Sequence, residues 1–552
     1  MAGVYCCRST DDGWPVRTNR IAIHLMASAV LTVMVAMSAV PAIAAKVPLD
    51  NASVADINAA LNAGTLTSEQ LVKLYLARIQ AYDKHGPRIN AVITLNPKAL
   101  DTARSLDRER KTKGPRSPLH GIPVVLKDNY DTFDMPTTGG SLLLEGWIPP
   151  QDAYVVKKLR DAGAIILAKA NLSEFASGGA HSSFGGQTLN PHDLTRTPAG
   201  SSGGTGAAIA ADFAMFGMGT DTGGSIRGPA TANGIVGLKP THGLLSRDGI
   251  IPLALSFDTG GPMARNVYDI AVSLGVMTGI DTKDEATQKS AGKSFTNYTQ
   301  FLDKDALKGA RIGIARDFMG ADSDVDWVIE SALASMRNAG ATIVDVRYPK
   351  WMLDAKTEFY NAVRYPEFAA QIADYLKKTG PQYPKNITEM ITKADSLRSV
   401  REDGAGPNPS RWTLFKREAA SGTLDDYRYL AVKNEGLQLM RTTMDGILKA
   451  QKLDAIVYPT SPRRPAMIAS NGETAASTPS SATNFANLTG FPDLIVPAGF
   501  TGDGLPVGIS FFGTAFSEPK LLALGYSFEQ TTHARRLPVH TPSLAVDYIN
   551  VP

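Results

Sequence analysis

The stretch from residue 178 to residue 261 places the strongest constraint on how this 552-residue chain folds. Glycine and serine are as dense there as in a flexible linker, but apolar runs interrupt them at 207–211, 213–218 and 235–238. A solvated linker does not carry such runs. We therefore expect an ordered segment whose glycines take positive φ values or bring the backbone close to a ligand.

Short apolar runs and helical patterns alternate on both sides of this stretch. The first run is rich in β-branched residues, as in a buried strand, and it delivers Lys127 and Asp128 at its end. Buried strands are expected at 121–126, 164–168, 455–458 and 494–496, and helices at 71–82, 154–159 and 519–530. This alternation predicts an α/β fold with a largely parallel or mixed sheet. Two polar segments with Gly and Pro, 281–305 and 395–421, are expected to be surface insertions.

The composition is that of a soluble globular protein, with 43% apolar and 20% charged residues. The formal net charge is only +3, and basic residues are interspersed with acidic ones. We therefore expect neither nucleic acid nor an anionic membrane as a partner.

The N-terminus has the three parts of a secretory signal peptide. Arg17 and Arg20 precede an apolar stretch at 21–40, and Pro-Ala-Ile-Ala follows at 41–44. This order predicts cleavage after Ala44 and export to the periplasm or the extracellular space, with no membrane insertion afterwards. An uncleaved membrane anchor is the alternative, because about 20 apolar residues are long enough to span a bilayer.

Cys6 and Cys7 are the only cysteines, and both precede the predicted cleavage site. The mature protein would then have no disulfide, no cysteine-ligated metal and no cysteine nucleophile. The eight histidines show no metal-binding spacing, so we expect no metal and no other cofactor.

Two familiar serine motifs occur in weak form. Residues 200–204, Gly-Ser-Ser-Gly-Gly, satisfy the nucleophile-elbow pattern of α/β-hydrolases, but no later histidine has a recognisable setting. Ser290 and Lys293, with Lys-Thr-Gly at 378–380, match part of a β-lactamase pattern, but their flanks are polar and no Ser-Asp-Asn lies between them.

A third pattern is far more specific. Gly-Ser-Ser-Gly-Gly-Thr-Gly at 200–206 is followed by Gly-Thr-Asp-Thr-Gly-Gly-Ser-Ile-Arg at 219–227, and Lys127 lies upstream at a strand end. Here the chain resembles the amidase signature family. The resemblance extends to 121–128, 171–175, 237–241, 489–492 and 505–508, and covers roughly residues 50–285 and 445–535.

The resemblance places the family's catalytic lysine on Lys127, its bridging serine on Ser201 and its acylated serine on Ser225. It also implies a cis peptide bond before Ser201. Serine needs a base, and burial can lower the pKa of a lysine by up to about 3 to 5 units, which leaves a neutral amine. The backbone amides of Thr222, Gly223, Gly224 and Ser225 are expected to form an oxyanion hole. Ser202, Asp221 and Arg227 are expected to support this site.

The fold implied is a single α/β/α domain at 45–552 with a large mixed sheet between helices and a variable, substrate-dependent region at about 290–445. The activity implied is hydrolysis of a carboxamide, a small molecule, to an acid and an amine or ammonia. Residues 171–175 and 246–250 look closest to peptide amidases and aryl acylamidases, which suggests a C-terminal amide or an anilide.

Several alternatives to a simple amidase stay open. The same acyl-enzyme chemistry would serve an ester or a carbamate. The ammonia-releasing subunit of a tRNA-dependent amidotransferase is a second possibility, although export argues against it. A binding protein that keeps only the scaffold is a third. The oligomeric state is not predicted.

Overall fold

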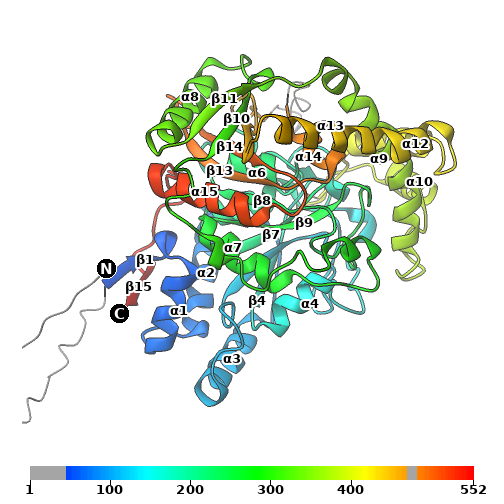
Figure 1. Ribbon diagram of the computed structural model, residues 1–552. Coiled ribbons are helices and arrows are strands. Elements are labelled where there is room, and N and C mark those ends of the chain that lie inside the picture. Colours follow the sequence, from blue (N-terminus) through cyan, green and yellow to red (C-terminus); the bar gives the residue numbers. More distant parts are fainter. Residues whose placement is uncertain (1–44, 404, 469–480) are drawn as a thin grey trace, which may run out of the picture. The chain divides into compact units, whose positions relative to one another are not determined.

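One mixed sheet of eleven strands runs through the molecule, and helices cover both of its faces (Figure 1). The computed structural model describes residues 45–403, 405–468 and 481–552, which fall in one compact unit. The α/β class and the large mixed sheet flanked by helices are confirmed. The predicted signal peptide at 1–44, with both cysteines, lies outside the described residues.

The strand order in the sheet is β11-β10-β12-β14-β13-β8-β9-β7-β3-β4-β2. Parallel pairs join β10 to β11 and β12, and β3 to β4 and β7, while the other pairs are antiparallel. Its strands are β2 (Val92–Leu95), β3 (Pro123–Lys127), β4 (Ile165–Ala170), β7 (Phe216–Asp221), β8 (Val236–Lys239), β9 (Thr259–Ala264), β10 (Arg311–Ala315), β11 (Thr342–Val346), β12 (Ala455–Pro459), β13 (Asp493–Phe500) and β14 (Pro506–Phe512). Small sheets pair β1 (Ala45–Pro48) with β15 (Tyr548–Val551) and β5 (His181–Ser182) with β6 (Gly186–Gln187).

Helices pack on the sheet in two groups. One group contains α7, α8 and α15: α15 contacts the other two, and the group packs on strands β8, β9 and β13. The other contains α5 and α6, which contact β3, β7 and β8. The helices are α1 (Val54–Ala63), α2 (Ser68–Tyr82), α3 (Ala99–Lys113), α4 (Tyr154–Asp161), α5 (Gly203–Ala210), α6 (Arg227–Ala232), α7 (Val267–Met277), α8 (Ser323–Asn338), α9 (Lys350–Leu376), α10 (Ile387–Ser396), α11 (Pro409–Ala419), α12 (Tyr427–Ala431), α13 (Leu437–Ala450), α14 (Thr483–Thr489) and α15 (Glu518–Thr532). A π-helical turn, Val432–Gly436, joins α12 to α13.

Short 3₁₀ helices complete the secondary structure: Leu49–Asn51, Leu142–Leu144, Glu174–Ala176, Glu285–Ser290, Thr299–Phe301 and Arg316–Phe318. No helix within the described ranges is both long enough and apolar enough to cross a lipid bilayer.

The Gly/Ser-rich stretch lies inside the fold, as its apolar runs predict. The three runs become helix α5 and strands β7 and β8, which are buried along their whole length. Strands β3 and β7 are parallel neighbours, with Leu126 opposite Met218. Because parallel neighbours end at the same sheet edge, Lys127 and Asp221 are brought to one place.

The variable region at about 290–445 contributes to the central sheet through β10 and β11. Residues 281–305 lie largely at the surface, as expected. The expectation of a surface insertion at 395–421 holds for residues 398–403, which are exposed, but not for helix α11. Helix α11 buries Trp412 and Phe415, together with an ion pair of 2.8 Å between Arg411 and Glu418. The charged residues made this helix look solvated, but they neutralise each other inside the protein.

Candidate active site

Lys127 is the last residue of β3 and its side chain is fully buried. Its Nζ lies 2.7 Å from Ser201 Oγ and 2.7 Å from Thr220 Oγ1. Asn129 Nδ2 also donates to Thr220 Oγ1, over 3.1 Å. The predicted base and the predicted bridging serine are therefore in direct hydrogen-bond contact.

Burial lowers the pKa of Lys127 from its ordinary value to about 7. The negative charges of Asp221 and Asp258 act in the opposite direction and keep the pKa from falling further. A substantial fraction of the side chain is then a neutral amine near neutral pH. A neutral amine can accept the proton of a hydroxyl.

The peptide bond between Gly200 and Ser201 is cis. The Ser201 carbonyl accepts a hydrogen bond from the backbone N–H of Ser173 over 3.0 Å. A side chain at position 200 would meet Ser173 Oγ at 2.5 Å and the Gly178 carbonyl at 2.8 Å, so only glycine fits there. Residues 173–179 thus hold Ser201 against Lys127.

Ser202 is fully buried and precedes α5. Its Oγ exchanges hydrogen bonds with the backbone of Thr220, and both distances are 3.2 Å. A completely buried hydroxyl engaged in this way does not suit the exposed nucleophile of a hydrolase elbow. Its backbone N–H donates to the carbonyl of Ser225 over 3.2 Å. Ser202 therefore joins the segment of Ser201 to the segment of Ser225.

Ser225 lies on a tight turn between β7 and α6 and is partly exposed, unlike Lys127 and Ser201. Gly224 has φ +122°, a conformation that favours glycine. The Gly224 N–H donates to Asp221 Oδ1 over 2.9 Å, so this predicted oxyanion donor already has another partner. The N–H groups of Thr222, Gly223 and Ser225 make no hydrogen bond to any part of the chain that the structure describes.

The turn is fixed by a buried ion pair. Arg227 donates to both carboxylate oxygens of Asp221 over 3.0 Å and to Asp493 over 2.9 Å. Asn487 adds a hydrogen bond to Asp221 over 2.9 Å. Burial by itself would raise the pKa of Asp221, but Arg227 and these hydrogen bonds hold it well below its usual range. Asp221 is therefore ionised and rigidly held.

A small pocket lies directly beside Thr220. Polar groups of Asn129, Thr220, Thr222 and Asp258 line the side nearest the lysine, and Ile250, Ile251, Leu253 and Leu255 supply apolar walls. Its cavity volume of about 10 Å³ is that of a single water molecule, so the pocket marks the mouth of the site and does not hold a substrate in this conformation.

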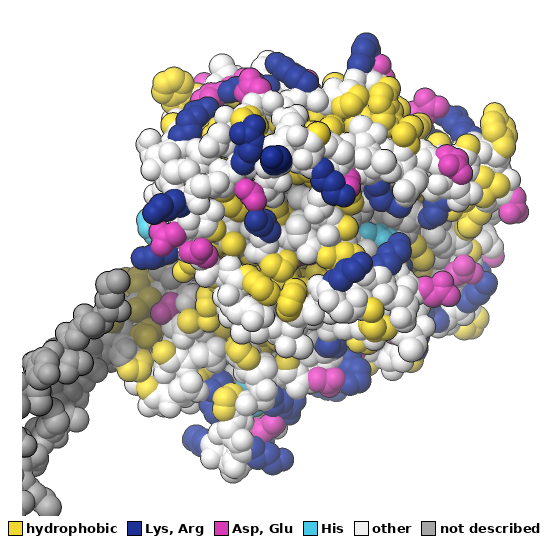
Figure 2. All heavy atoms as spheres, viewed as in Figure 1, with side chains coloured by type: hydrophobic (Ala, Val, Ile, Leu, Met, Phe, Trp, Pro, Cys, Tyr) yellow, Lys and Arg dark blue, Asp and Glu magenta, His cyan; other side chains and the backbone are white. Residues whose placement is uncertain are grey.

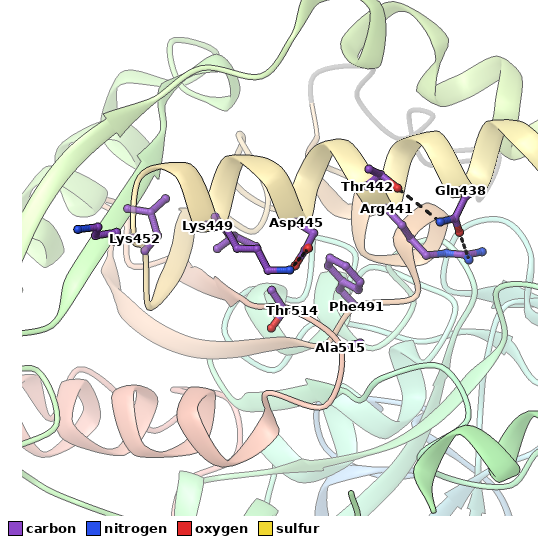
Figure 3. A pocket seen from close by; sticks show the side chains of 11 residues that line it. Gln438, Arg441, Thr442, Asp445, Lys449, Lys452, Phe491, Thr514 and Ala515 are labelled. Atoms are coloured by element: carbon purple, nitrogen blue, oxygen red, sulfur yellow. Dashed lines mark hydrogen bonds and ion pairs between the residues drawn. The ribbon is translucent and has the colours of Figure 1, made fainter.

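A wider hollow lies beside α13, where basic side chains surround a depression in the surface (Figure 2). Arg441, Asp445 and Lys449 reach into it from the helix, and Phe491 and Thr514 form the opposite wall (Figure 3). Lys449 is paired with Asp445 over 2.5 Å. None of the predicted catalytic residues lines this hollow.

The two weaker motifs do not form sites. Ser290 Oγ donates to the backbone carbonyl of Thr287, and Lys293 Nζ lies over the ring of Phe516. Lys378 is paired with Asp131 instead. His242 Nε2 contacts the carbonyl of Leu255 over 2.9 Å. Within the described residues, no group of three or more His, Cys, Asp and Glu side chains is placed to hold a metal ion.

Sequence reasoning missed three polar residues of the site: Asn129, Thr220 and Asp258. Thr220 had a usable signal, because it belongs to the motif at 219–227 that also contains Ser225. Asp258 had none, because its contact with Thr222 spans 36 residues.

A family model described as Amidase matches residues 70–522. The chain belongs to the amidase family. It is therefore an enzyme that hydrolyses amide C–N bonds, as the resemblance implied.

Relatives of two kinds are similar to this amidase. A glutamyl-tRNA(Gln) amidotransferase subunit of Alkalilimnicola ehrlichii is 37% identical over 490 residues, which cover 88% of this chain and 98% of that protein. The crystal structure of native peptide amidase from Stenotrophomonas maltophilia is 39% identical with a TM-score of 0.80, and 89% of this chain and 99% of that chain are covered. The corresponding glutamyl-tRNA(Gln) amidotransferase subunit of Thermotoga maritima is 27% identical with a TM-score of 0.67, covering 89% and 98%.

Proposed function

We propose that this amidase acts alone and hydrolyses a carboxamide through an acyl-enzyme on Ser225, with Ser201 as the bridging residue and Lys127 as the base. The observation that carries the proposal is the 2.7 Å contact between the buried Lys127 Nζ and Ser201 Oγ. The lowered pKa of Lys127 supports the role of base.

In the first half of the reaction, Ser225 Oγ attacks the carbonyl carbon of the amide. Its proton passes to Ser201 Oγ as the Ser201 proton passes to neutral Lys127. The negative oxygen of the tetrahedral intermediate accepts hydrogen bonds from the unpartnered N–H groups of Thr222, Gly223 and Ser225.

In the second half, the C–N bond breaks and the leaving nitrogen receives the proton from Lys127 through Ser201. Water then attacks the acyl-enzyme and gives its proton to the same relay. The carboxylic acid leaves, and Ser225 recovers its hydrogen. Asp221 and Arg227 hold the turn in place throughout, and Ser202 fixes its distance from Ser201.

We propose a peptide amide or an anilide as the substrate. The TM-score of 0.80 and the 39% identity with peptide amidase support this class. Esters and carbamates of the same acyl group would enter the same mechanism.

The second candidate is an ammonia-releasing subunit that works within a protein complex. The 37% identity over 98% of the Alkalilimnicola ehrlichii protein favours it. This function would require partner proteins and glutamine as the amide.

An amide panel separates the two candidates. The purified chain is incubated with peptide amides, anilides, short aliphatic amides, the matching esters and glutamine, without ATP or other proteins. Turnover of a peptide amide or an anilide well above that of glutamine supports the stand-alone amidase. A preference for glutamine would overturn it.

We also propose that residues 1–44 direct export. Expression of the full chain in a bacterial host, followed by fractionation and N-terminal sequencing, tests this directly. Mature protein that starts at Ala45 outside the cytoplasm is the expected result, and cytoplasmic protein with an intact N-terminus would contradict it.

A further inference from the structure

We propose that Asp258 is a positioning residue of the active site: it ties Thr222 of the oxyanion turn to the loop that lines the pocket and places an unpaired negative charge near Lys127. This inference rests on the proposed acyl-enzyme mechanism.

The contacts of Asp258 join two segments. Its Oδ1 accepts the hydroxyl of Thr222 over 2.5 Å. Its Oδ2 accepts the backbone N–H groups of Leu253 and Ala254 over 2.8 and 3.0 Å. Asp258 and Thr222 are both nearly fully buried. A single carboxylate therefore sets the position of a predicted oxyanion donor relative to the apolar wall.

The charge of Asp258 is not neutralised as the charge of Asp221 is. Asp221 forms an ion pair with Arg227, whereas no described cation lies within ion-pair distance of Asp258. Arg247 lines the same pocket but forms its ion pair with Asp284. Burial raises the pKa of Asp258, while its three hydrogen bonds and, to a smaller extent, the charge of Arg247 act against that rise.

The other charged groups around the lysine are accounted for. Asp128, which follows Lys127, pairs with Lys169 of β4 over 2.9 Å. Asp221 is held by Arg227. The ring of Tyr360 stacks on Phe257, its hydroxyl lies beside Gly223 of the turn, and the charge of Asp258 raises the pKa of this tyrosine further. Of the two carboxylates whose charge acts on Lys127, Asp258 is thus the one that forms no ion pair with a described cation.

Two consequences follow from this arrangement. An unpaired negative charge stabilises the ammonium form of Lys127, so its removal lowers the pKa of the lysine further. Loss of the Thr222 contact loosens the oxyanion turn and lowers kcat. A purely structural residue would produce the second effect without the first.

The chain offers matched controls on the same loop. Glu367 of α9 accepts the Ser256 N–H over 2.9 Å and pairs with Lys433 over 3.2 Å, so it anchors the loop from the opposite side without facing Lys127. Thr222→Val removes the hydroxyl that contacts Asp258 but leaves the charge of Asp258 in place. Asp258→Asn keeps the shape and one acceptor oxygen, and the Thr222 hydroxyl can accept from the new amide.

The experiment measures kcat and kcat/KM against pH for the wild type, Asp258→Asn, Thr222→Val and Glu367→Gln, on the best amide of the panel. We expect the rise in kcat/KM for Asp258→Asn to move to lower pH by about one unit, with a smaller loss of kcat than in Thr222→Val, because the new amide can still bond to the Thr222 hydroxyl. In Thr222→Val kcat falls and the midpoint of the rise stays in place. In Glu367→Gln KM increases and the midpoint again stays in place.

An unshifted midpoint in folded Asp258→Asn, as judged by circular dichroism, would overturn the proposal. If Asp258→Asn does not fold, an undiminished kcat in Thr222→Val overturns the positioning role. Failure of the underlying mechanism looks different, because the wild type itself would then show no pH-dependent amide hydrolysis.

Discussion

The backbone N–H of Ser202 donates to the carbonyl of Ser225 over 3.2 Å. This bond joins the segment of the bridging serine to the segment of the nucleophile without using either hydroxyl. The relative position of the two segments is therefore independent of both side chains that we propose as catalytic. Substitutions that remove the hydroxyls alone are expected to leave the fold intact.

Ser201→Ala and Ser225→Ala should each reduce amide hydrolysis by at least about 10³-fold, because the relay loses its bridge or its nucleophile. Steady-state assays measure the loss, and circular dichroism and thermal melting verify the fold. Full activity in Ser225→Ala would show that the nucleophile is another residue.

Activity of the wild type should rise as the pH increases through about 7, the pKa of Lys127, because only the neutral amine accepts a proton. The kcat/KM profile on a non-titrating amide measures this. Lys127→Ala should be inactive over the whole range. A flat wild-type profile between about pH 6 and 9 would contradict the assignment of the base.

Lys127→Met should stabilise the protein most at low pH. The pKa of Lys127 is lower in the folded protein than its ordinary value of 10.5. The lysine therefore destabilises the fold least above pH 10.5. This destabilisation grows as the pH falls below 10.5, because the lysine then binds a proton in the unfolded chain but not in the folded one. The destabilisation is largest below about pH 7, where the lysine is protonated in both states. Melting temperatures of the two proteins across this range test the sign. A difference that does not change with pH would count against burial of a neutral amine.

Arg227→Met should destabilise the protein by about 3 to 5 kcal/mol, because it leaves Asp221 and Asp493 buried without their cation. A lower denaturant midpoint measures this. Arg316→Met is the control, since its ion pairs with Glu330 and Asp345 lie near the surface and should contribute less than about 1 kcal/mol. Similar losses in the two variants would contradict a special role for the buried network.

Much of the fold was predictable because its signals are local. Strands β3 and β4 are short, largely apolar and fully buried, so composition alone marks them. Helix α11 was missed because Arg411 and Glu418 look like surface charges until their partners are known. In the site, the motif at 219–227 locates Ser225. That motif also contains Thr220, but only the pairing of β3 with β7 reveals that Thr220 contacts Lys127.

The family, the α/β class and the choice of Lys127, Ser201 and Ser225 as candidates can all be read from the sequence, because they depend on contiguous motifs and on burial patterns that a short window contains. Three properties are decided only in the folded protein. These are the lowered pKa of Lys127, the set of backbone N–H groups that have no partner among the described residues, and the position of Asp258 beside the site. They arise from desolvation and from contacts between distant segments, such as the pair formed by Thr222 and Asp258. No local pattern records such contacts.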